Sequence, residues 1–337
     1  MTLKEIAALT GTSVSTVSRV LNQKSPTCAS KELQEKIWET ARQTGYIPNE
    51  AARSLRHPNT APREPLTVTI VLARISSLEE EPFFSELLRC LEAELMQQNA
   101  AVKSVIYARN SLPKDFEPGG GIIILGRCSK DLLSEILSKT RHVVGIWRNP
   151  VDFDVDEVIC DGQKAAELAI RYLLDLGHRQ IAYIGSCSYE SRYIGYCEML
   201  IRRSIPMDYS LIKPTNQSRA EAETAVRQLL AQRREGSSKF SAIFCANDNT
   251  AVRVLEILDG CRKEFKDDPI SVISIDDISE AENTRPFLTT IHIPRGEMAH
   301  MAVLLLLDRI AGGHEEIARI EFPCRIVRRA SCYPRGK

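Results

Sequence analysis

The sequence lacks the features that mark exported, membrane-spanning or disulfide-stabilised proteins. No apolar run approaches the ~18 residues that a membrane span needs. The ten cysteines are scattered, with no CxxC pair, which favours reduced thiols over a disulfide framework or a zinc site. The chain opens directly into a helical pattern and not into an apolar secretory stretch. These absences predict a cytoplasmic protein that binds no membrane and uses no metal or other cofactor.

The motifs of common enzymes are also absent. The three glycines at 119–121 are not followed by Lys and Ser or Thr, so they form no P-loop. Neither an H-E-x-x-H nor a G-x-S-x-G motif occurs. Asp276 and Asp277 could suggest a catalytic carboxylate pair, but adjacent side chains at a strand end point apart. We therefore expect that the protein is not an enzyme.

Charge of one sign is not in excess, because the chain has 44 basic and 44 acidic residues. The first 57 residues carry eight basic and five acidic side chains, so they have a net charge of +3 and the remainder has −3. This polarity is too mild to identify a partner by itself. The 337 residues are enough for two or more domains.

Secondary-structure signals divide the chain into three parts. Residues 1–46 carry only helical signals, and 47–65 hold a short helical pattern followed by a linker with three prolines. From 66 to 337, β-branched apolar runs alternate with helical stretches, which predicts an α/β fold with parallel sheets covered by helices on both faces. The length favours two sheets with a cleft between them. The predicted N-subdomain takes about 66–160 and 292–322, and the C-subdomain takes about 161–291 and 323–333.

The first residues predict a helix-turn-helix unit. Thr2 and Glu5 fit a T-x-x-E capping box, so a helix should begin near Leu3. Gly11 can turn with a positive φ, and Ser13 is a good N-cap for a second helix. The residues expected on the inner faces of these helices are Ile6, Ala7, Leu9, Val17, Val20 and Leu21. A helix-turn-helix has a small residue where the helices cross, a glycine in the turn and an apolar anchor on the second helix, and Ala7, Gly11 and Val17 fit this spacing. Other three-helix scaffolds share the same spacing.

The outward face of the second helix carries side chains suited to DNA. Arg19 can bond a guanine in bidentate fashion, Val14 can touch a thymine methyl, and Ser15 can contact several bases. The residues suited to phosphate contacts are Ser13, Thr16, Ser18 and Asn22. A third helix should follow a Ser30 cap, with Tyr46 closing the unit. Its apolar residues are Leu33, Ile37, Trp38 and Ala41.

Several long strings are more specific than these spacings. The N-terminal ones are TLKEIA at 2–7, STVSRVLN at 15–22 and GYIPNEAARSLR at 45–56. Those further along are LGHRQIAYIG at 176–185, ANDNTA at 246–251, ISVISIDDI at 270–278 and PFLTTI at 286–291. They closely resemble the lactose/galactose repressor (LacI/GalR) family of transcription regulators. The resemblance implies a periplasmic-binding-protein-like effector domain of two Rossmann-like subdomains, joined by three crossovers with a ligand between them.

The resemblance also implies that residues 49–57 form a hinge helix. Asn49 can cap it, but about eight residues cannot hold a helix alone in water. We therefore expect it to fold only when it pairs with its dimer mate on DNA. Leu55 matches the residue that wedges into the minor groove at the operator centre in the family, and Arg56 would follow it. A core-packed linker leucine is the alternative for Leu55. Tyr46 completes the predicted DNA contacts.

Arg192 and Asp248 are the principal ligand contacts that we predict. Each lies at a strand-to-helix junction, where α/β sheets place ligands, and both groups suit sugar hydroxyls. The alternatives are a surface salt bridge for Arg192 and a helix N-cap for Asp248. The further candidates are Asn247, Trp147 and Phe84. Trp147 either stacks on a sugar ring or fills space, and Phe84 either lines the pocket or packs in the core.

Together these features predict a sequence-specific DNA-binding transcription regulator that acts as a homodimer on double-stranded operator DNA. We expect a repressor of carbohydrate-utilisation genes that a small sugar inducer releases from a palindromic operator. The alternatives are a corepressor-type regulator that senses a nucleobase or a phosphoprotein partner, and a sugar-binding protein without a DNA role. The end of the chain has no heptad pattern, which favours a dimer over a tail-zipped tetramer.

Overall fold

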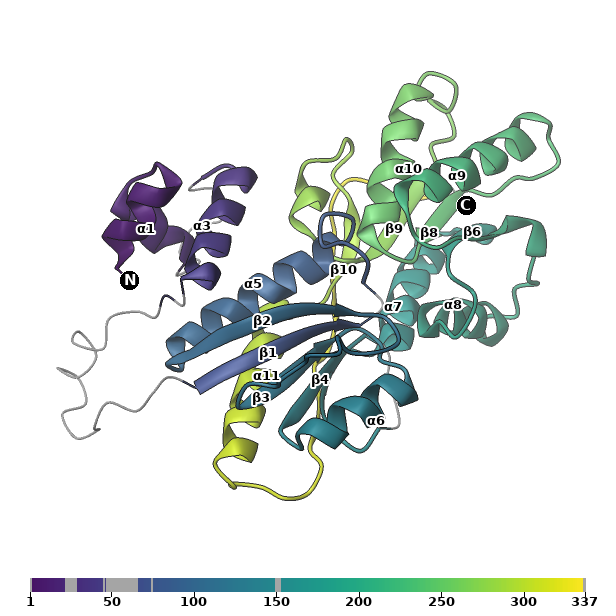
Figure 1. Ribbon diagram of the computed structural model, residues 1–337. Coiled ribbons are helices and arrows are strands. Elements are labelled where there is room, and N and C mark those ends of the chain that lie inside the picture. Colours follow the sequence, from purple (N-terminus) through teal and green to yellow (C-terminus); the bar gives the residue numbers. More distant parts are fainter. Residues whose placement is uncertain are drawn as a thin grey trace.

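The computed structural model describes residues 2–21, 29–44, 46, 66–73, 75–148 and 153–335 (Figure 1). A small helical head precedes two α/β subdomains, each built around its own sheet. The fold class predicted from the sequence is therefore confirmed. The expected hinge helix at 49–57 lies outside the described residues.

The head contains α1 (Leu3–Thr10), α2 (Val14–Leu21) and α3 (Lys31–Gln43). The predicted capping box is present, because the Glu5 amide donates to the Thr2 hydroxyl and the Thr2 amide donates to the Glu5 carboxylate at 2.8 Å. The apolar side chains that meet between the helices are Ile6, Ala7, Val17, Val20, Leu21, Ile37, Trp38 and Ala41. This core sets the angle at which α2 faces outward.

One expected core residue of the head is exposed. Leu9 leaves 58% of its surface in solvent, whereas Thr10 takes the inner position at 4%. The Thr10 hydroxyl donates to the carbonyl oxygen of Ile6 at 2.7 Å, so its burial leaves no donor unpaired. The prediction of a buried Leu9 is wrong.

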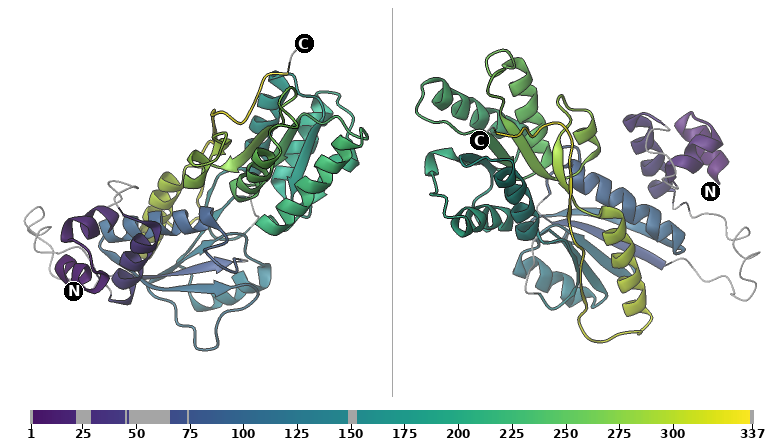
Figure 2. Two further views of the ribbon diagram at one scale, coloured as in Figure 1. Left: turned by 90° about the horizontal axis from the view of Figure 1, so that it is seen from above. Right: turned by 180° about the vertical axis from the view of Figure 1, so that it is seen from behind.

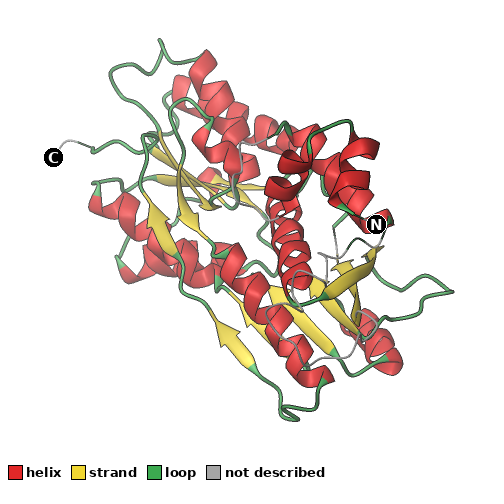
Figure 3. Ribbon diagram, turned by 90° about the vertical axis from the view of Figure 1, so that its left-hand side faces the viewer, coloured by secondary structure: helices red, strands yellow, loops and turns green. Residues whose placement is uncertain are grey.

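The two α/β subdomains contain one six-stranded sheet each (Figure 3). In the first sheet, all neighbouring strands are parallel. Its strands, in spatial order, are β11 (Arg319–Glu321), β5 (Asp156–Ile159), β4 (Val143–Trp147), β3 (Gly121–Leu125), β1 (Leu66–Ala73) and β2 (Ala100–Ala108). The central strands are buried on both faces, which explains their continuous apolar runs.

The second sheet is parallel except at one edge, where β12 runs antiparallel to β10. Its strands, in spatial order, are β12 (Arg325–Val327), β10 (Thr289–His292), β9 (Ser271–Asp276), β8 (Ala242–Cys245), β6 (Ile181–Gly185) and β7 (Ile212–Pro214). Short 3-10 turns follow α8 and β9, at Tyr209–Leu211 and Ser279–Glu282. Because both sheets are parallel at their centres, their carboxyl ends are the natural place for a ligand.

Helices cover both faces of each sheet (Figure 2). On the first sheet, α5 (Pro82–Gln97) and α11 (Arg295–Ile310) pack on one face and α6 (Lys130–Lys139) packs on the other. The helices of the second sheet are α7 (Gly162–Asp175), α8 (Ser191–Arg202), α9 (Arg219–Arg234) and α10 (Asp248–Gly260). None of the helices in the described ranges is long and apolar enough to cross a membrane.

Three connections carry the chain between the sheets: from β5 to β6 through α7, from β10 to β11 through α11, and from β11 directly to β12. The last is only a few residues long and runs beside the first, because β5 and β11 are parallel neighbours. The three connections therefore form the hinge about which the subdomains can turn.

The head packs against α5 of the first subdomain. Its core cluster includes Ala93 and Met96 from that helix. Arg42 of α3 pairs with Glu92 of α5 at 3.0 Å. A second ion pair joins Arg89 of α5 to Glu35 of α3 at 3.1 Å. Burial raises the pKa of Glu92 to about 7. Helix α5 thus contacts the head along its middle and its C-terminal half.

Candidate DNA-reading helix and effector cleft

Helix α2 presents the predicted DNA contacts on its outward side. The Ser13 hydroxyl accepts from the Thr16 amide at 3.1 Å, so Ser13 caps the helix as the sequence predicts. The candidates that lie exposed or half-buried along it are Val14, Ser15, Thr16, Ser18 and Arg19. The opposite side packs into the head through Val17, which is fully buried. Asn22, Asn49, Leu55 and Arg56 lie outside the described residues.

Tyr46 does not lie on this DNA-facing side. Only 6% of its surface is exposed, and it belongs to the head core with Trp38 and Ala41. Its amide donates to the Ala41 carbonyl at 3.0 Å, which folds the chain back onto the end of α3. This position in the head core matches its other predicted role, which is to close the unit, and the DNA contact at Tyr46 stays a prediction.

The cleft between the subdomains is bridged by a buried ion pair. Arg148 directly follows β4 of the first sheet, and its Nη1 donates to Oδ1 of Asp276, the last residue of β9, at 2.6 Å. Its guanidinium also lies over the rings of Phe83 and Phe84, at 4.5 and 5.1 Å from their centroids. The sequence reasoning missed this pair. The sequence signal of Arg148 is a cation directly after a buried strand, whereas Arg192 lies in the first turn of α8.

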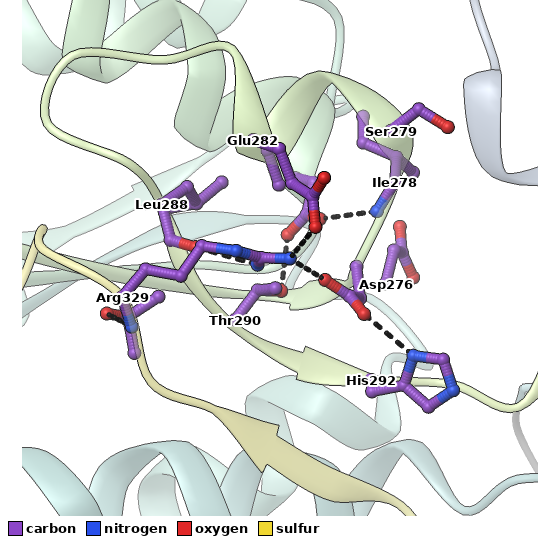
Figure 4. A network of polar contacts seen from close by, with 12 residues as sticks. Asp276, Ile278, Ser279, Glu282, Leu288, Thr290, His292 and Arg329 are labelled. Carbon is purple, nitrogen blue, oxygen red and sulfur yellow. Dashed lines mark hydrogen bonds and ion pairs between the residues drawn. The ribbon is translucent and has the colours of Figure 1, made fainter. Parts of the chain in front are cut away.

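The chain bends sharply where Asp276 enters the cleft. Asp276 and Asp277 have φ values of 132° and 56°, in a region that side chains other than glycine rarely adopt. The guanidinium of Arg295 donates to the carbonyl oxygens of both residues. The Asp277 carboxylate accepts from His292 at 2.7 Å and Arg329 at 2.8 Å (Figure 4). The two carboxylates therefore face different partners, as expected for adjacent residues.

Asp248 supports this bend and does not face the cleft. It is fully buried, and its carboxylate accepts from the Ser274 hydroxyl at 2.5 Å and the Thr290 hydroxyl at 2.6 Å. The Ile278 amide donates to its other oxygen at 2.9 Å. Burial, with the nearby charge of Asp276, raises its pKa to about 7. In this conformation protein groups hold both carboxylate oxygens of Asp248, and the ligand contact stays a prediction.

Arg192 is also held by the protein itself. Its Nε and Nη2 donate to the two carboxylate oxygens of Glu190 at 2.7 and 2.8 Å, and its Nη1 donates to the Ala246 carbonyl at 2.7 Å. Burial acts to raise the pKa of Glu190, but the charge and hydrogen bonds of Arg192 outweigh it and lower that pKa. The pair is buried, unlike the surface salt bridge considered as an alternative. A ligand reaches Arg192 only if this pair rearranges.

The three remaining pocket candidates take different places. Asn247, and not Asp248, is the N-cap of α10, because its side chain accepts from the Thr250 amide at 3.0 Å. Phe84 lies beneath Arg148 with 8% of its surface exposed. Trp147 is 1% exposed and packs edge-on against Phe153 in the core below α6. Its indole ring therefore offers no face to a ligand in this conformation, which favours the space-filling alternative.

A polar cavity of about 620 Å³ is lined by residues of both subdomains, but not by the predicted ligand contacts or by Arg148 and Asp276. Its walls come from the loop that precedes α5, at 76–82, and from the second subdomain at 216–220. Its charged lining residues are Glu79, Glu80, Glu81, Glu280, Arg109 and Arg219. Burial raises the pKa of Glu81. The volume lies within the ~300–1,000 Å³ range of small-molecule sites.

Comparison with known proteins gives the same two-part organisation. The model of bacterial regulatory proteins of the lacI family matches residues 2–49, and that of the periplasmic binding protein-like domain matches 170–332. The PurR transcriptional repressor of Erwinia tasmaniensis is 28% identical, over 98% of this chain and 96% of its own length.

The chain joins a LacI-family helix-turn-helix domain to a periplasmic-binding-protein-like domain.

Solved LacI-family structures share its fold. A regulator from Enterococcus faecium with bound ribose is 28% identical, with a TM-score of 0.67 over 80% of this chain and 100% of its own. The lac repressor dimer bound to operator and an anti-inducer is 22% identical, with a TM-score of 0.64 over 99% of both chains. The protein is accordingly a DNA-binding transcription regulator, as the sequence predicts.

Proposed function

We propose that this protein is a repressor of carbohydrate-utilisation genes and leaves its operator when a small neutral sugar binds between the subdomains. The proposal rests on the Arg148–Asp276 pair, which bridges the two subdomains, and on a polar cavity lined by residues of both subdomains. A hydroxyl group both donates and accepts hydrogen bonds. A sugar can therefore separate these two side chains while giving each a partner, so that neither charge is left buried and unpaired.

The lining of the cavity favours a sugar over the other effector classes. Glu79 and Glu80 can accept from hydroxyls, and the four carboxylates in the lining outnumber the two guanidiniums, which disfavours a phosphate group. Among its described lining residues none is aromatic, so a planar base finds no ring to stack on. The ribose in the regulator from Enterococcus faecium supports the same class of ligand.

Helix α5 is suited to carry the signal to the head. Its first turn holds Phe83 and Phe84 under Arg148, and Glu86 accepts from both the amide and the hydroxyl of Ser279 in the second subdomain. Further along, Glu92 pairs with Arg42 of the head. A sugar that separates the subdomains would pull on the first turn of α5 and thereby shift the contacts that its later turns make with α3.

The DNA-bound state in this proposal is a homodimer. Two copies place two α2 helices in successive major grooves of a near-palindromic operator, and the 49–57 segments meet over the groove between them. A sugar that prefers the released state by ~1–3 kcal/mol lowers operator affinity by about 5–150-fold.

A thermal-shift panel on the purified full-length protein tests the effector. Pentoses, hexoses, disaccharides, sugar phosphates and nucleobases are compared at the same concentration. The proposal expects stabilisation by at least one neutral sugar, because a ligand that binds the folded state raises its melting temperature. Stabilisation by a nucleobase or a sugar phosphate alone would contradict it.

A further inference from the structure

Two cysteines meet in the hinge between the subdomains. Cys160 directly follows β5 on the first connection, and Cys324 lies on the short connection from β11 to β12. The Phe322 amide donates to the Ile159 carbonyl at 2.9 Å, which holds these two connections side by side. The register that places Glu321 opposite Ile159 brings Cys160 and Cys324 near one another on adjacent connections, where each thiol shifts the pKa of the other. Both side chains belong to the same hydrophobic cluster.

The environments of the two thiols differ. Cys160 is completely buried, and its hydrogen bond to Cys324, together with burial, raises its pKa. Cys324 is only partly buried, and the hydrogen bond from Cys160 lowers its pKa. The Lys164 ammonium acts in the same direction, and the Asp161 carboxylate opposes it. Cys324 is thus the more easily ionised member of the pair, and Cys160 is a protonated thiol beside it.

A cavity of about 680 Å³ gives solvent access to Cys324. Its cationic lining residues are Lys164, Arg171, Arg202 and Arg203, against the carboxylates of Glu167 and Glu321. A cationic surrounding stabilises a thiolate, which is the nucleophilic form of cysteine. The described residues contain no group of three or more potential metal ligands, so the pair has no metal-binding set around it there.

We propose that Cys324 and Cys160 form a peroxide-sensitive dithiol that locks the hinge when it is oxidised. The Cys324 thiolate attacks the distal oxygen of a hydroperoxide, the O–O bond breaks, and the departing alkoxide takes up a proton to leave as an alcohol or water. Cys324 is then a sulfenic acid. The Cys160 sulfur attacks the Cys324 sulfur, the S–OH bond breaks, and the Cys160 proton leaves with the hydroxyl as water. The peroxide is reduced and the two thiols become a disulfide.

The disulfide would join two of the three connections between the subdomains. Rotation about the hinge requires these connections to shift relative to one another, so a covalent bond between them restricts that rotation. An oxidised protein would keep whichever subdomain angle it had when the bond formed. This regulation acts on the hinge, independently of which effector binds in the cleft.

A second cysteine pair supplies an internal control. Cys187 and Cys197 lie close enough to influence each other, but burial raises the pKa of both thiols. Since reactivity follows the thiolate fraction, we expect iodoacetamide at pH 7 to modify Cys324 at least about tenfold faster than Cys187 in the reduced protein. Equal rates would overturn the assignment of Cys324 as the reactive thiol.

Peptide mapping after peroxide treatment tests the bond itself. The reduced full-length protein is treated with hydrogen peroxide, blocked with iodoacetamide and digested. We expect a Cys160–Cys324 linked peptide that dithiothreitol removes, while Cys187 and Cys197 stay alkylated. In Cys160→Ser the product should instead be a sulfenic acid at Cys324, trapped by dimedone. Absence of both products, or equal linkage of Cys187 to Cys197, would overturn the proposal.

Hydrogen exchange tests whether the disulfide restricts motion of the connections between the subdomains. Oxidation should slow amide exchange in the peptides that span residues 159–162 and 321–325 at least severalfold. The Cys160→Ser/Cys324→Ser double variant should show no such change after the same treatment. Unchanged exchange in an oxidised protein that contains the disulfide would show that the bond does not restrict the hinge.

Discussion

Arg148 and Asp276 join the two subdomains by a 2.6 Å ion pair at the carboxyl ends of β4 and β9. The side chains are 14% and 3% exposed, so the pair is largely withdrawn from water. Breaking it without a substitute would strand two charges in a low-dielectric site, which is costly. A ligand that gives both side chains new partners would compensate for the loss of this pair.

Replacement of Arg148 by alanine tests its role in binding. Removal of a charge-assisted hydrogen bond costs about 1.5–3 kcal/mol, so sugar affinity should fall roughly 10- to 150-fold in titration calorimetry. Arg127→Ala is the matched control, since Arg127 also reaches across the boundary but donates to an exposed backbone oxygen, that of Tyr189. An equal loss in both variants would argue against a specific role for Arg148.

Arg19 is the side chain of α2 that we expect to read a base. Arg19→Ala should cost ~1–3 kcal/mol of operator affinity and relax the preference at one base pair in each half-site. Fluorescence anisotropy with a selected operator and its single-substitution variants measures both effects. Lys36→Ala, on the exposed side of α3, should leave the base preference unchanged. An Arg19 variant that weakens all duplexes equally would point to a phosphate contact.

Leu55 lies outside the described residues, and its wedge role stays a prediction from the sequence. Leu55→Ala should reduce the bend of the operator, because an apolar wedge between base steps is what unstacks them. Electrophoretic mobility with the operator placed at different positions in the duplex reports the bend. If the operator bend and the operator affinity of the variant both match those of the unchanged protein, the assignment of residues 49–57 as a hinge helix fails.

Asp248 makes stability depend on pH. Its pKa is raised from 3.8 to about 7, so between those values the folded protein holds a proton that the unfolded chain has released. The contribution of this carboxyl to the free energy of unfolding is therefore present below about pH 4 and is lost as pH rises to 7, by at most ~1.4 kcal/mol per pH unit.

The Asp248→Asn variant isolates this effect. Its amide can keep the three contacts, because the hydroxyls of Ser274 and Thr290 can accept as well as donate. Urea unfolding at pH 4 to 7 should show the variant gaining stability relative to the parent as pH rises. Glu92, whose pKa is also about 7, is the same in both proteins and cancels. A difference that does not vary with pH would refute the assignment.

The structure of the head was predictable because interactions between residues close together in the sequence determine it. The T-x-x-E box, the Ser13 cap and a glycine with a φ of 71° at Gly11 each act within a few residues of the chain. The one error in its core came from helical spacing, since Leu9 and Thr10 are three and four residues after Ile6 and both can share its face. A hydroxyl that bonds within the helix made Thr10 the buried residue.

The position of the cleft was predictable from the sequence, but the side chains that face it were not. Asp248 and Asp276 both lie just after or at the end of a buried strand, so the sequence does not distinguish them. Partners 26 and 42 residues away, at Ser274 and Thr290, make Asp248 structural. Trp147 is the last residue of β4, a strand that is buried on both faces. The strand therefore shows no alternation of polar and apolar residues that would indicate on which face of the sheet the indole ring lies.

The most direct test of the account is operator binding by the full-length protein in the presence of sugars. Fluorescence anisotropy is measured with a labelled duplex selected from a random pool, for the unchanged protein and for Arg148→Ala. We predict that at least one neutral sugar lowers operator affinity about 5–150-fold and that Arg148→Ala abolishes this response. If no sugar alters operator affinity while a nucleobase or a phosphorylated partner does, the proposed effector cleft is contradicted.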